Sequence, residues 1–477
     1  MADRDLLIRN VEIGGRPGLD LRVRNGRIAE IGARLAPCPN DFDGCGGALL
    51  PGLIDHHAHL LASAVQAASI RLEDAADGEA IARRIRDAAR DQPGSTWLRA
   101  TGYHERIAGP LTRAELDSIL PHRPLRVQHQ TGGLWMLNSA ALALVATGET
   151  PDCVERGSDG RPTGRIFRGD AWLRAQIGST PPDVTAIGRA LARLGITGVT
   201  DASVSTDSVA AAHLANAVRN GALPVRLMLM SGGELEAPED GAFAVGPVKI
   251  LPDDHDLPPL DEMIATIAQA RRWNRRVAVH CVTAGELAIS LAAFGAAGSL
   301  PGDRIEHGSI IPAEAIPVLR DLGLTVVTQP GFVHERGDRY LADVPLSEQP
   351  DLYRCASLIA AGVPLAGSSD APYAGWDPWA AVRAAATRRT RNGAQVTPAE
   401  AVTAQAALNL FLGAQSDPGA APRALCMGAE ADFCLLDCTI REALAEPDAG
   451  HVAATFLSGR ITHSRAVSRQ IKSPPGQ

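Results

Sequence analysis

The sequence predicts an α/β protein: a (β/α)8 TIM-type barrel with a small β-sandwich domain formed from both termini. The chain has 477 residues, which is longer than one typical domain. Its middle alternates helix-like and strand-like segments, while both ends look like series of short β-strands. We therefore expect the sandwich at residues 1–50 plus 415–477 and the barrel at residues 51–414.

Both ends of the chain alternate apolar and polar residues, the pattern of strands with one buried face. The amino-terminal end contains LLIRNVEI, GLDLRVRNGRIAEIGA and GGALL, with an Asn-Gly turn at Asn25-Gly26. The far end contains ADFCLLDC and HVAATFLSGRITH, with a Ser-Gly turn in the second segment. Two β-rich ends that flank a long middle predict one β domain assembled from both.

The middle of the chain repeats one unit: an amphipathic helix, a Gly or Asn turn and a buried strand. Clear examples are VTAIGRALARLGITGVTDAS, LDEMIATIAQARRWNRRVAVHC, AEAIPVLRDLGLTVVTQP and YRCASLIAAGVPLAGSSDAP. Repeated units of this kind predict a parallel sheet covered by helices, and eight of them commonly close into a barrel. Periodicity alone also fits an open, doubly wound sheet, so the choice depends on where the polar residues lie.

Composition argues against several classes of function. The formal net charge of −8 leaves no basic footprint for nucleic acid or anionic lipid. No apolar run is long enough to span a membrane and the first residues lack the pattern of a signal peptide, so we expect a cytoplasmic protein. The eight cysteines have no zinc-finger spacing and are expected to be free thiols. The expected partner is a small-molecule substrate, and the sequence leaves a homodimer open.

Residue types that bind metals lie at the ends of four predicted strands. LLPGLIDHHAHL carries His57 and His59, RVAVHC ends in His280, RIEHGS contains His307 and VPLAGSSDAP contains Asp370. Side chains two apart on a strand point the same way, so His57 and His59 can bind one ion. The carboxyl ends of barrel strands meet at one rim, where imidazole and carboxylate ligands from separate strands can share a divalent metal such as zinc.

Each of these residues has a simpler structural explanation when it is taken alone. A lone buried histidine is more often a hydrogen-bonded core residue, and one His-x-His can arise by chance among 13 histidines. Four histidines at strand ends, with an aspartate after Gly-Ser-Ser, are harder to explain by packing. The joint pattern therefore predicts a metal site and favours the closed barrel over the open sheet.

Lys249 is a further candidate for the same site. It lies on the apolar strand of GPVKILPDD, where a lysine must be paired, neutralised or modified. It either forms an ion pair with Asp253 or Asp254, or it carries a carbamate that bridges two metals.

Three further residues are candidate substrate contacts: His104 in GYHER, His129 in VQHQTGG and Arg354. For Arg354, a structural ion pair is the alternative.

The run PGLIDHHAHL resembles the strand-one motif of the amidohydrolase superfamily, in which the two outer histidines of His-x-His bind metal. The chain as a whole is similar to the YtcJ-like branch, which includes N-substituted formamide deformylases. The matching segments, in the family's order, are LRVQHQTGGLWMLNSAAL, RPTGRIF, GITGVTDAS, RVAVHCVTAGEL, DRIEHGSIIP, VVTQP, AGVPLAGSSDAP, TPAEAV and DFCLLD.

This resemblance implies a (β/α)8 barrel with a β-sandwich built from both termini. It also implies a catalytic aspartate at Asp370, and it places Lys249 where the branch has a lysine often interpreted as the carbamylated bridge. The implied metal ligands are His57, His59, His280 and His307.

Two departures from the branch predict a different substrate pocket. The lysine is followed by the short, acidic PDDHDLPPLDEM, where the branch has Asp-Gly-Ser and a long insertion. Gly133 stands where the branch often has a histidine, so His129 is a candidate to replace it. Both changes weaken the case for a formamide as the substrate.

The resulting hypothesis is a metal-dependent hydrolase that cleaves a C–N bond in an amide, formamide, cyclic imide or urea-like group. One or two divalent metal ions per chain, with zinc as the first choice, would activate water, and Asp370 would move its proton. The alternative is a metal-dependent esterase or lactonase, or a lyase or isomerase, on the same barrel. A non-catalytic scaffold is less favoured because every ligand type is retained.

Overall fold

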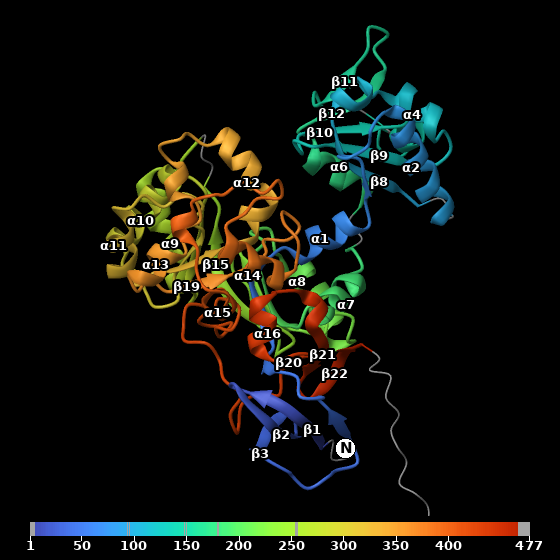
Figure 1. Ribbon diagram of the computed structural model, residues 1–477. Helices are drawn as coiled ribbons and strands as arrows, with labels where there is room; N and C mark the ends of the chain where they lie inside the picture. Colours follow the sequence, from blue (N-terminus) through green and yellow to red (C-terminus); the bar gives the residue numbers. More distant parts are fainter. Residues whose placement is uncertain are drawn as a thin grey trace, which may run out of the picture. The chain divides into compact units, whose positions relative to one another are not determined.

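The computed structural model describes residues 5–92, 94, 96–146, 148, 150–178, 181–252 and 256–465. These residues form two compact units (Figure 1). The first comprises the described parts of Met1–Leu60 and Val184–Gln477, and the second comprises those of Leu61–Asp183. The sequence patterns do not single out the second unit, which lies inside the range predicted for the barrel. The predicted domain boundaries at residues 50 and 415 stay a prediction.

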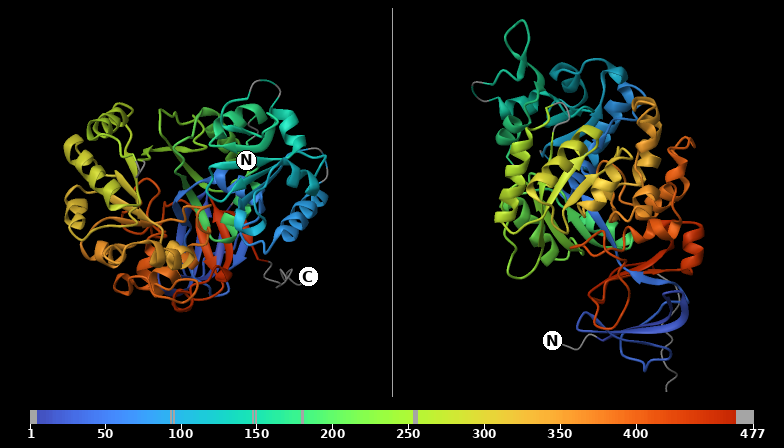
Figure 2. Two further views of the ribbon diagram at one scale, coloured as in Figure 1. Left: turned by 90° about the horizontal axis from the view of Figure 1, so that it is seen from above. Right: turned by 90° about the vertical axis from the view of Figure 1, so that its left-hand side faces the viewer.

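Eight parallel strands form the barrel sheet of the first unit, and neighbours in the sheet follow one another along the chain. The strands are largely apolar because the sheet is covered on both faces, as parallel sheets usually are. The intervening helices lie on the outer side of the strands (Figures 1 and 2). This arrangement confirms the predicted (β/α)8 barrel. The strands are β6 (Leu53–Ala58), β13 (Ile196–Asp201), β14 (Arg226–Ser231), β15 (Ala244–Ile250), β16 (Val277–Cys281), β17 (Arg304–His307), β18 (Thr325–Thr328) and β19 (Leu365–Gly367).

The barrel closes where its first strand meets the segment that follows its last strand. The Asp370 N–H donates to the His57 carbonyl at 2.8 Å, and the His59 N–H donates to the Ala371 carbonyl at 2.8 Å. Both bonds lie at the carboxyl ends of the strands. The helices of the barrel are α7 (Thr185–Arg193), α8 (Ser208–Arg219), α9 (Leu260–Arg272), α10 (Ala284–Ala297), α11 (Ala315–Asp321), α12 (Gly331–Asp343), α13 (Ala356–Ala360) and α14 (Pro378–Thr387).

Two four-stranded sheets built from both ends of the chain form the predicted β-sandwich. Their inner faces share one apolar core, to which Ile8 and Leu21 contribute from one sheet and Phe433 and Phe456 from the other. The predicted turn at Asn25-Gly26 joins two paired strands, and both of its residues have positive φ, 49° and 74°. The strands are β1 (Leu6–Ile13), β2 (Arg16–Arg24), β3 (Arg27–Gly32) and β4 (Asp41–Asp43) in one sheet, and β5 (Leu49–Pro51), β20 (Phe433–Leu436), β21 (Val452–Leu457) and β22 (Arg460–Ser464) in the other.

The second unit is a six-stranded mixed sheet with helices packed against it. One buried core includes Ile81 of α2, Leu116 of α4 and Val127 of the sheet. The strands are β7 (Ile70–Arg71), β8 (Leu98–Tyr103), β9 (Leu125–His129), β10 (Leu134–Leu137), β11 (Val154–Arg156) and β12 (Pro162–Phe167), and the helices are α2 (Gly78–Asp91), α3 (Glu105–Ala108), α4 (Arg113–Ile119), α5 (Ser139–Val145) and α6 (Asp170–Ile177).

The remaining elements are short. None of the helices in the described part of the chain is long and apolar enough to cross a membrane. These elements are α1 (Leu60–Ala67), α15 (Ala404–Asn409), α16 (Ile440–Ala445) and the 3-10 turns Gln349–Asp351, Pro398–Glu400 and Ala449–His451.

Asn138 links three segments of the second unit through its side-chain amide, which is fully buried. Its oxygen accepts the N–H of Ala141 at 2.9 Å, which caps α5, and the N–H of Leu125 at 3.0 Å. Its nitrogen donates to the carbonyls of Leu120 and Arg123 at 2.6 and 2.8 Å. We expect Asn138→Ala to destabilise this unit by about 2–4 kcal/mol, because buried backbone groups lose their partners.

Hydrogen exchange measured residue by residue checks this prediction, because it reports the second unit separately from the barrel. Asn216→Ala changes an exposed asparagine of α8 and is the matched control, with no expected effect. Unchanged protection of β9 and α5 in Asn138→Ala would contradict the prediction.

Candidate metal centre

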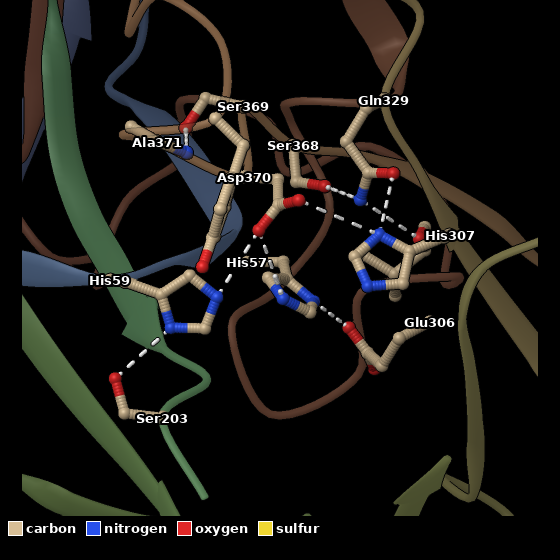
Figure 3. A network of polar contacts seen from close by, with 12 residues as sticks. His57, His59, Ser203, Glu306, His307, Gln329, Ser368, Ser369, Asp370 and Ala371 are labelled. Carbon is tan, nitrogen blue, oxygen red and sulfur yellow. Dashed lines mark hydrogen bonds and ion pairs between the residues drawn. The ribbon is translucent and has the colours of Figure 1, made fainter. Parts of the chain in front are cut away.

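The predicted ligands come together at the carboxyl ends of the barrel strands. The rings of His57 and His307 lie 4.8 Å apart between centroids, those of His57 and His59 lie 5.3 Å apart, and those of His280 and His307 lie 4.4 Å apart. Asp370 lies among them, as Figure 3 shows for three of the histidines. The structure therefore gathers all five residues that the strand-end pattern selected.

The Asp370 carboxylate lies against three imidazoles. Its Oδ1 is 3.2 Å from Nε2 of His59 and 3.5 Å from Nε2 of His57, and its Oδ2 is 3.8 Å from Nδ1 of His307. Asp370 and His307 both have left-handed backbones, with φ of 56° and 68°. Such conformations are uncommon outside glycine and cluster at functional sites.

The three imidazoles around Asp370 are oriented through their Nδ1 atoms. Nδ1 of His57 contacts the carboxylate of Glu306, Nδ1 of His59 lies 3.0 Å from Oγ of Ser203, and Nδ1 of His307 lies 2.9 Å from Oε1 of Gln329. A carboxylate or amide oxygen at Nδ1 makes that nitrogen the donor and leaves the lone pair on Nε2. Metal-binding histidines are commonly oriented in this way.

Glu306, Gln329 and Ser203 were missed by the sequence reasoning. For Glu306 a signal was available, since Arg304 and Glu306 alternate with apolar residues on a buried strand and so point the same way. Arg304 Nε donates to Glu306 at 2.6 Å, and Arg304 Nη2 donates at 3.0 Å. The buried carboxylate is thus balanced by a buried guanidinium.

Burial favours the neutral form of three of the candidate histidines. It lowers the pKa of His280 to about 4, with a smaller effect of the positive charge of Lys249 in the same direction. It also lowers the pKa values of His57 and His307 well below the usual range. A histidine must be neutral to bind a metal, so these imidazoles are suited to that role at neutral pH.

Lys249 of β15 is buried beside the same cluster. Its side-chain nitrogen has no hydrogen-bond partner among the described residues. Burial lowers the pKa of Lys249, while the carboxylates of Glu306 and Asp370 act in the opposite direction. The alternative partners Asp253 and Asp254 lie outside the described residues.

The centre fits a divalent metal. Three buried polar atoms of the cluster lack a hydrogen-bond partner among the described residues: Nε2 of His57, Oδ1 of Asp370 and Nζ of Lys249. Unpaired buried polar atoms are rare because each one costs desolvation energy, so they call for a ligand. Imidazole nitrogen and carboxylate oxygen are ligands that suit zinc and similar ions.

Two of the three predicted substrate contacts belong to the second unit, and the third forms ion pairs within the first. His104 and His129 belong to the second unit, where their ring centroids are 5.3 Å apart and Nε2 of His129 is 2.9 Å from the Glu105 carboxylate. Their contact with substrate stays a prediction. Arg354 pairs with Glu400 at 3.2 Å and with Asp351, which supports the structural alternative for its role.

Comparison with known proteins identifies the family. Residues 42–463 match the model of the amidohydrolase family, so the chain belongs to that family and is an enzyme of the amidohydrolase class. It is 27% identical over 488 residues to the N-substituted formamide deformylase of Arthrobacter pascens, covering 86% of this chain and 88% of that protein. It is 25% identical over 421 residues to the putative amidohydrolase YtcJ of Bacillus subtilis, covering 77% and 79%.

Solved structures share the fold. An uncharacterized metal-dependent hydrolase from Pyrococcus horikoshii superposes with a TM-score of 0.76 at 20% identity, over 94% of this chain and 99% of that one. The family, the fold and the cluster together define a metal-dependent hydrolase, which is the class that the sequence pattern predicted.

Lys249→Met tests whether the buried amine destabilises the fold in the absence of a metal. In chelator-treated protein we expect the free energy of unfolding to rise by about 1–3 kcal/mol, because methionine fills a similar volume without a buried polar group. Urea unfolding followed by circular dichroism measures the change. A loss of stability would instead mean that the attraction between the amine and its two neighbouring carboxylates outweighs its desolvation.

Proposed function

We propose that this chain hydrolyses a C–N bond of a small molecule, in an amide, formamide, cyclic imide or urea-like group. The observation that carries the proposal is the convergence of His57, His59, His280 and His307 on one catalytic-type carboxylate, Asp370. The unpaired ligand atoms in that cluster and the family of the chain both support it.

The four histidines would hold one or two divalent ions, with zinc as the first choice. When bound, such an ion lowers the pKa of water from about 15.7 to about 7 and polarises a carbonyl oxygen. Lys249, converted to a carbamate, would bridge two ions. Its buried and unpaired nitrogen beside Glu306 and Asp370 supports this role.

Asp370 is the proposed proton carrier. Its Oδ1 has no hydrogen-bond partner among the described residues, so it is available to accept a proton from water and to deliver it to the leaving nitrogen. The neighbouring side chains hold the geometry: Glu306 orients His57, and Gln329 orients His307.

Within this reaction class, the sequence and the relatives bear on which kind of C–N compound is the substrate. The formamide deformylase of Arthrobacter pascens supports a formamide. The short acidic segment after Lys249 and the glycine at position 133 favour a substrate pocket that differs from the one usual in the YtcJ-like branch. A panel of formamides, amides, cyclic imides and ureas tests these classes directly.

Metal analysis is the first test of the proposal. We expect about two equivalents of zinc, manganese or iron per chain by inductively coupled plasma spectrometry, and their loss after chelation. About one equivalent would retain the hydrolase and leave Lys249 as a structural lysine. Protein that holds no metal and takes none up on reconstitution would refute the proposed chemistry.

Asp370→Ala should lower kcat by at least about a hundredfold while the metal content stays unchanged, because proton transfer by a positioned side chain contributes about 10²–10⁴-fold. Steady-state rates on a substrate found in the panel measure this effect. Asp343→Ala, which removes an exposed carboxylate paired with Arg339, is the matched control. Full activity in Asp370→Ala would exclude the assigned role.

A further inference from the structure

A positively charged side chain without a counter-ion lies on α12, the helix that follows β18. Arg336 has no carboxylate within ion-pair distance among the described residues. One turn further along the chain, Arg339 pairs with Asp343 at 3.0 Å, on a part of the helix that is more exposed. Of these two arginines, Arg339 thus has a carboxylate partner, and the half-buried Arg336 does not.

Arg336 is connected to the metal centre by one aromatic ring. Its Nε and Nη2 donate to the Tyr373 carbonyl at 3.2 and 2.7 Å, and its guanidinium lies 5.9 Å from the centre of the Tyr373 ring. The same ring meets the His59 ring edge-to-face at 5.9 Å between centroids. Arg336 and Tyr373 thus form a wall beside His59. Tyr373 is 58% exposed, so this wall is open to a ligand.

A second tyrosine, Tyr340, lies on the same helix as Arg336. The phenol of Tyr340 is 2.9 Å from that of Tyr353, and Ser309 donates to Tyr353 at 2.9 Å. Burial raises the pKa of Tyr340, and the Asp370 charge adds to this effect while Arg336 opposes it.

The wall is therefore cationic and aromatic on the side of the centre next to His59. An uncompensated guanidinium flanked by aromatic rings is a site for a carboxylate, which it can bind through two parallel hydrogen bonds or as a charge over short range. Arg304, a buried arginine near the centre, is not available in this way because it is paired with Glu306, and Lys249 belongs to the proposed metal centre itself.

We propose that Arg336, with the Tyr373 ring beside it, binds a carboxylate group of the substrate and thereby selects amides whose amine or acyl part is anionic. This inference rests on the proposed function, because it assigns one end of the substrate to the metal centre. The structural alternative is that Arg336 only holds the segment after Asp370, a task that Glu335 shares by accepting the Gly375 N–H at 2.9 Å.

Hydroxamates that bind metals test the inference without any need for a known substrate. One series consists of monohydroxamates of straight-chain dicarboxylic acids, and the matched series consists of alkyl hydroxamates of the same length that lack the carboxylate. Calorimetric titration of the metal-loaded protein gives a dissociation constant for each compound. We expect the best carboxylate compound to bind at least about tenfold more tightly than its neutral match.

Arg336→Met should abolish this preference and leave the affinity for the neutral hydroxamates unchanged. Arg336→Lys should retain part of the preference because it keeps the charge. Arg339→Met, on the same helix, is the matched control and should behave as the wild type, because its charge is already paired.

The other outcomes separate the two proposals. Equal affinity for both series in the wild type would overturn the carboxylate subsite while leaving the metal centre in place. An equal loss of affinity for both series in Arg336→Met would also overturn it, since the arginine would then only position the segment after Asp370. A wild type that binds neither series, although loaded with metal, would overturn the proposed function and the subsite with it.

Discussion

The closed seam of the barrel is the constraint on which the site depends. Backbone hydrogen bonds of 2.8 Å join His57 to Asp370 and His59 to Ala371 across this seam, although the two segments are far apart in the chain. A carboxylate oxygen of Asp55 accepts the N–H groups of His57 and Ser369 at 3.2 and 3.0 Å, which fixes both sides. Left-handed backbone at Asp370 costs of order 1–3 kcal/mol, a strain that persists only where the surrounding structure determines it. The hydrogen bonds of the seam supply that structure. The position of the Asp370 carboxylate therefore depends on closure of the barrel.

Below the rim, a buried ion pair keeps the first histidine in place. Glu306 contacts Nδ1 of His57 and is held by Arg304, whose Nη2 also donates to the His56 carbonyl at 2.7 Å. Removing one member of a buried pair typically costs about 3–5 kcal/mol because the other charge is left uncompensated. Orientation of the imidazole is therefore linked to the stability of the barrel interior, and a change at Glu306 would affect both.

The convergence of the candidate ligand histidines could be predicted because two rules act on them directly: side chains alternate along a strand, and the strand ends of a barrel share one rim. Glu306 and Gln329 could not be assigned to His57 and His307 in the same way, because their contacts depend on which strands are neighbours and on side-chain rotamers. The unit at Leu61–Asp183 was missed for a different reason. Its helices and strands have the same local sequence patterns as those of the barrel. What distinguishes the unit is antiparallel pairing, of β9 with β10, of β10 with β12 and of β11 with β12.

The balance of charge around Lys249 gives a physical reason for a lysine at this position. Arg304 balances Glu306, and the ammonium of Lys249 can balance Asp370, so the cluster with neutral histidines has no large net charge. Two divalent cations added to such a cluster, the case for which the carbamate is proposed, would bring four positive charges that nothing present neutralises. Conversion of the amine to a carbamate would replace one positive charge by one negative charge and so offset two of the four. A permanent carboxylate at this position would leave an excess of negative charge before the metals arrive, whereas a lysine that is modified as the metals bind would limit the excess charge of the buried cluster in both states.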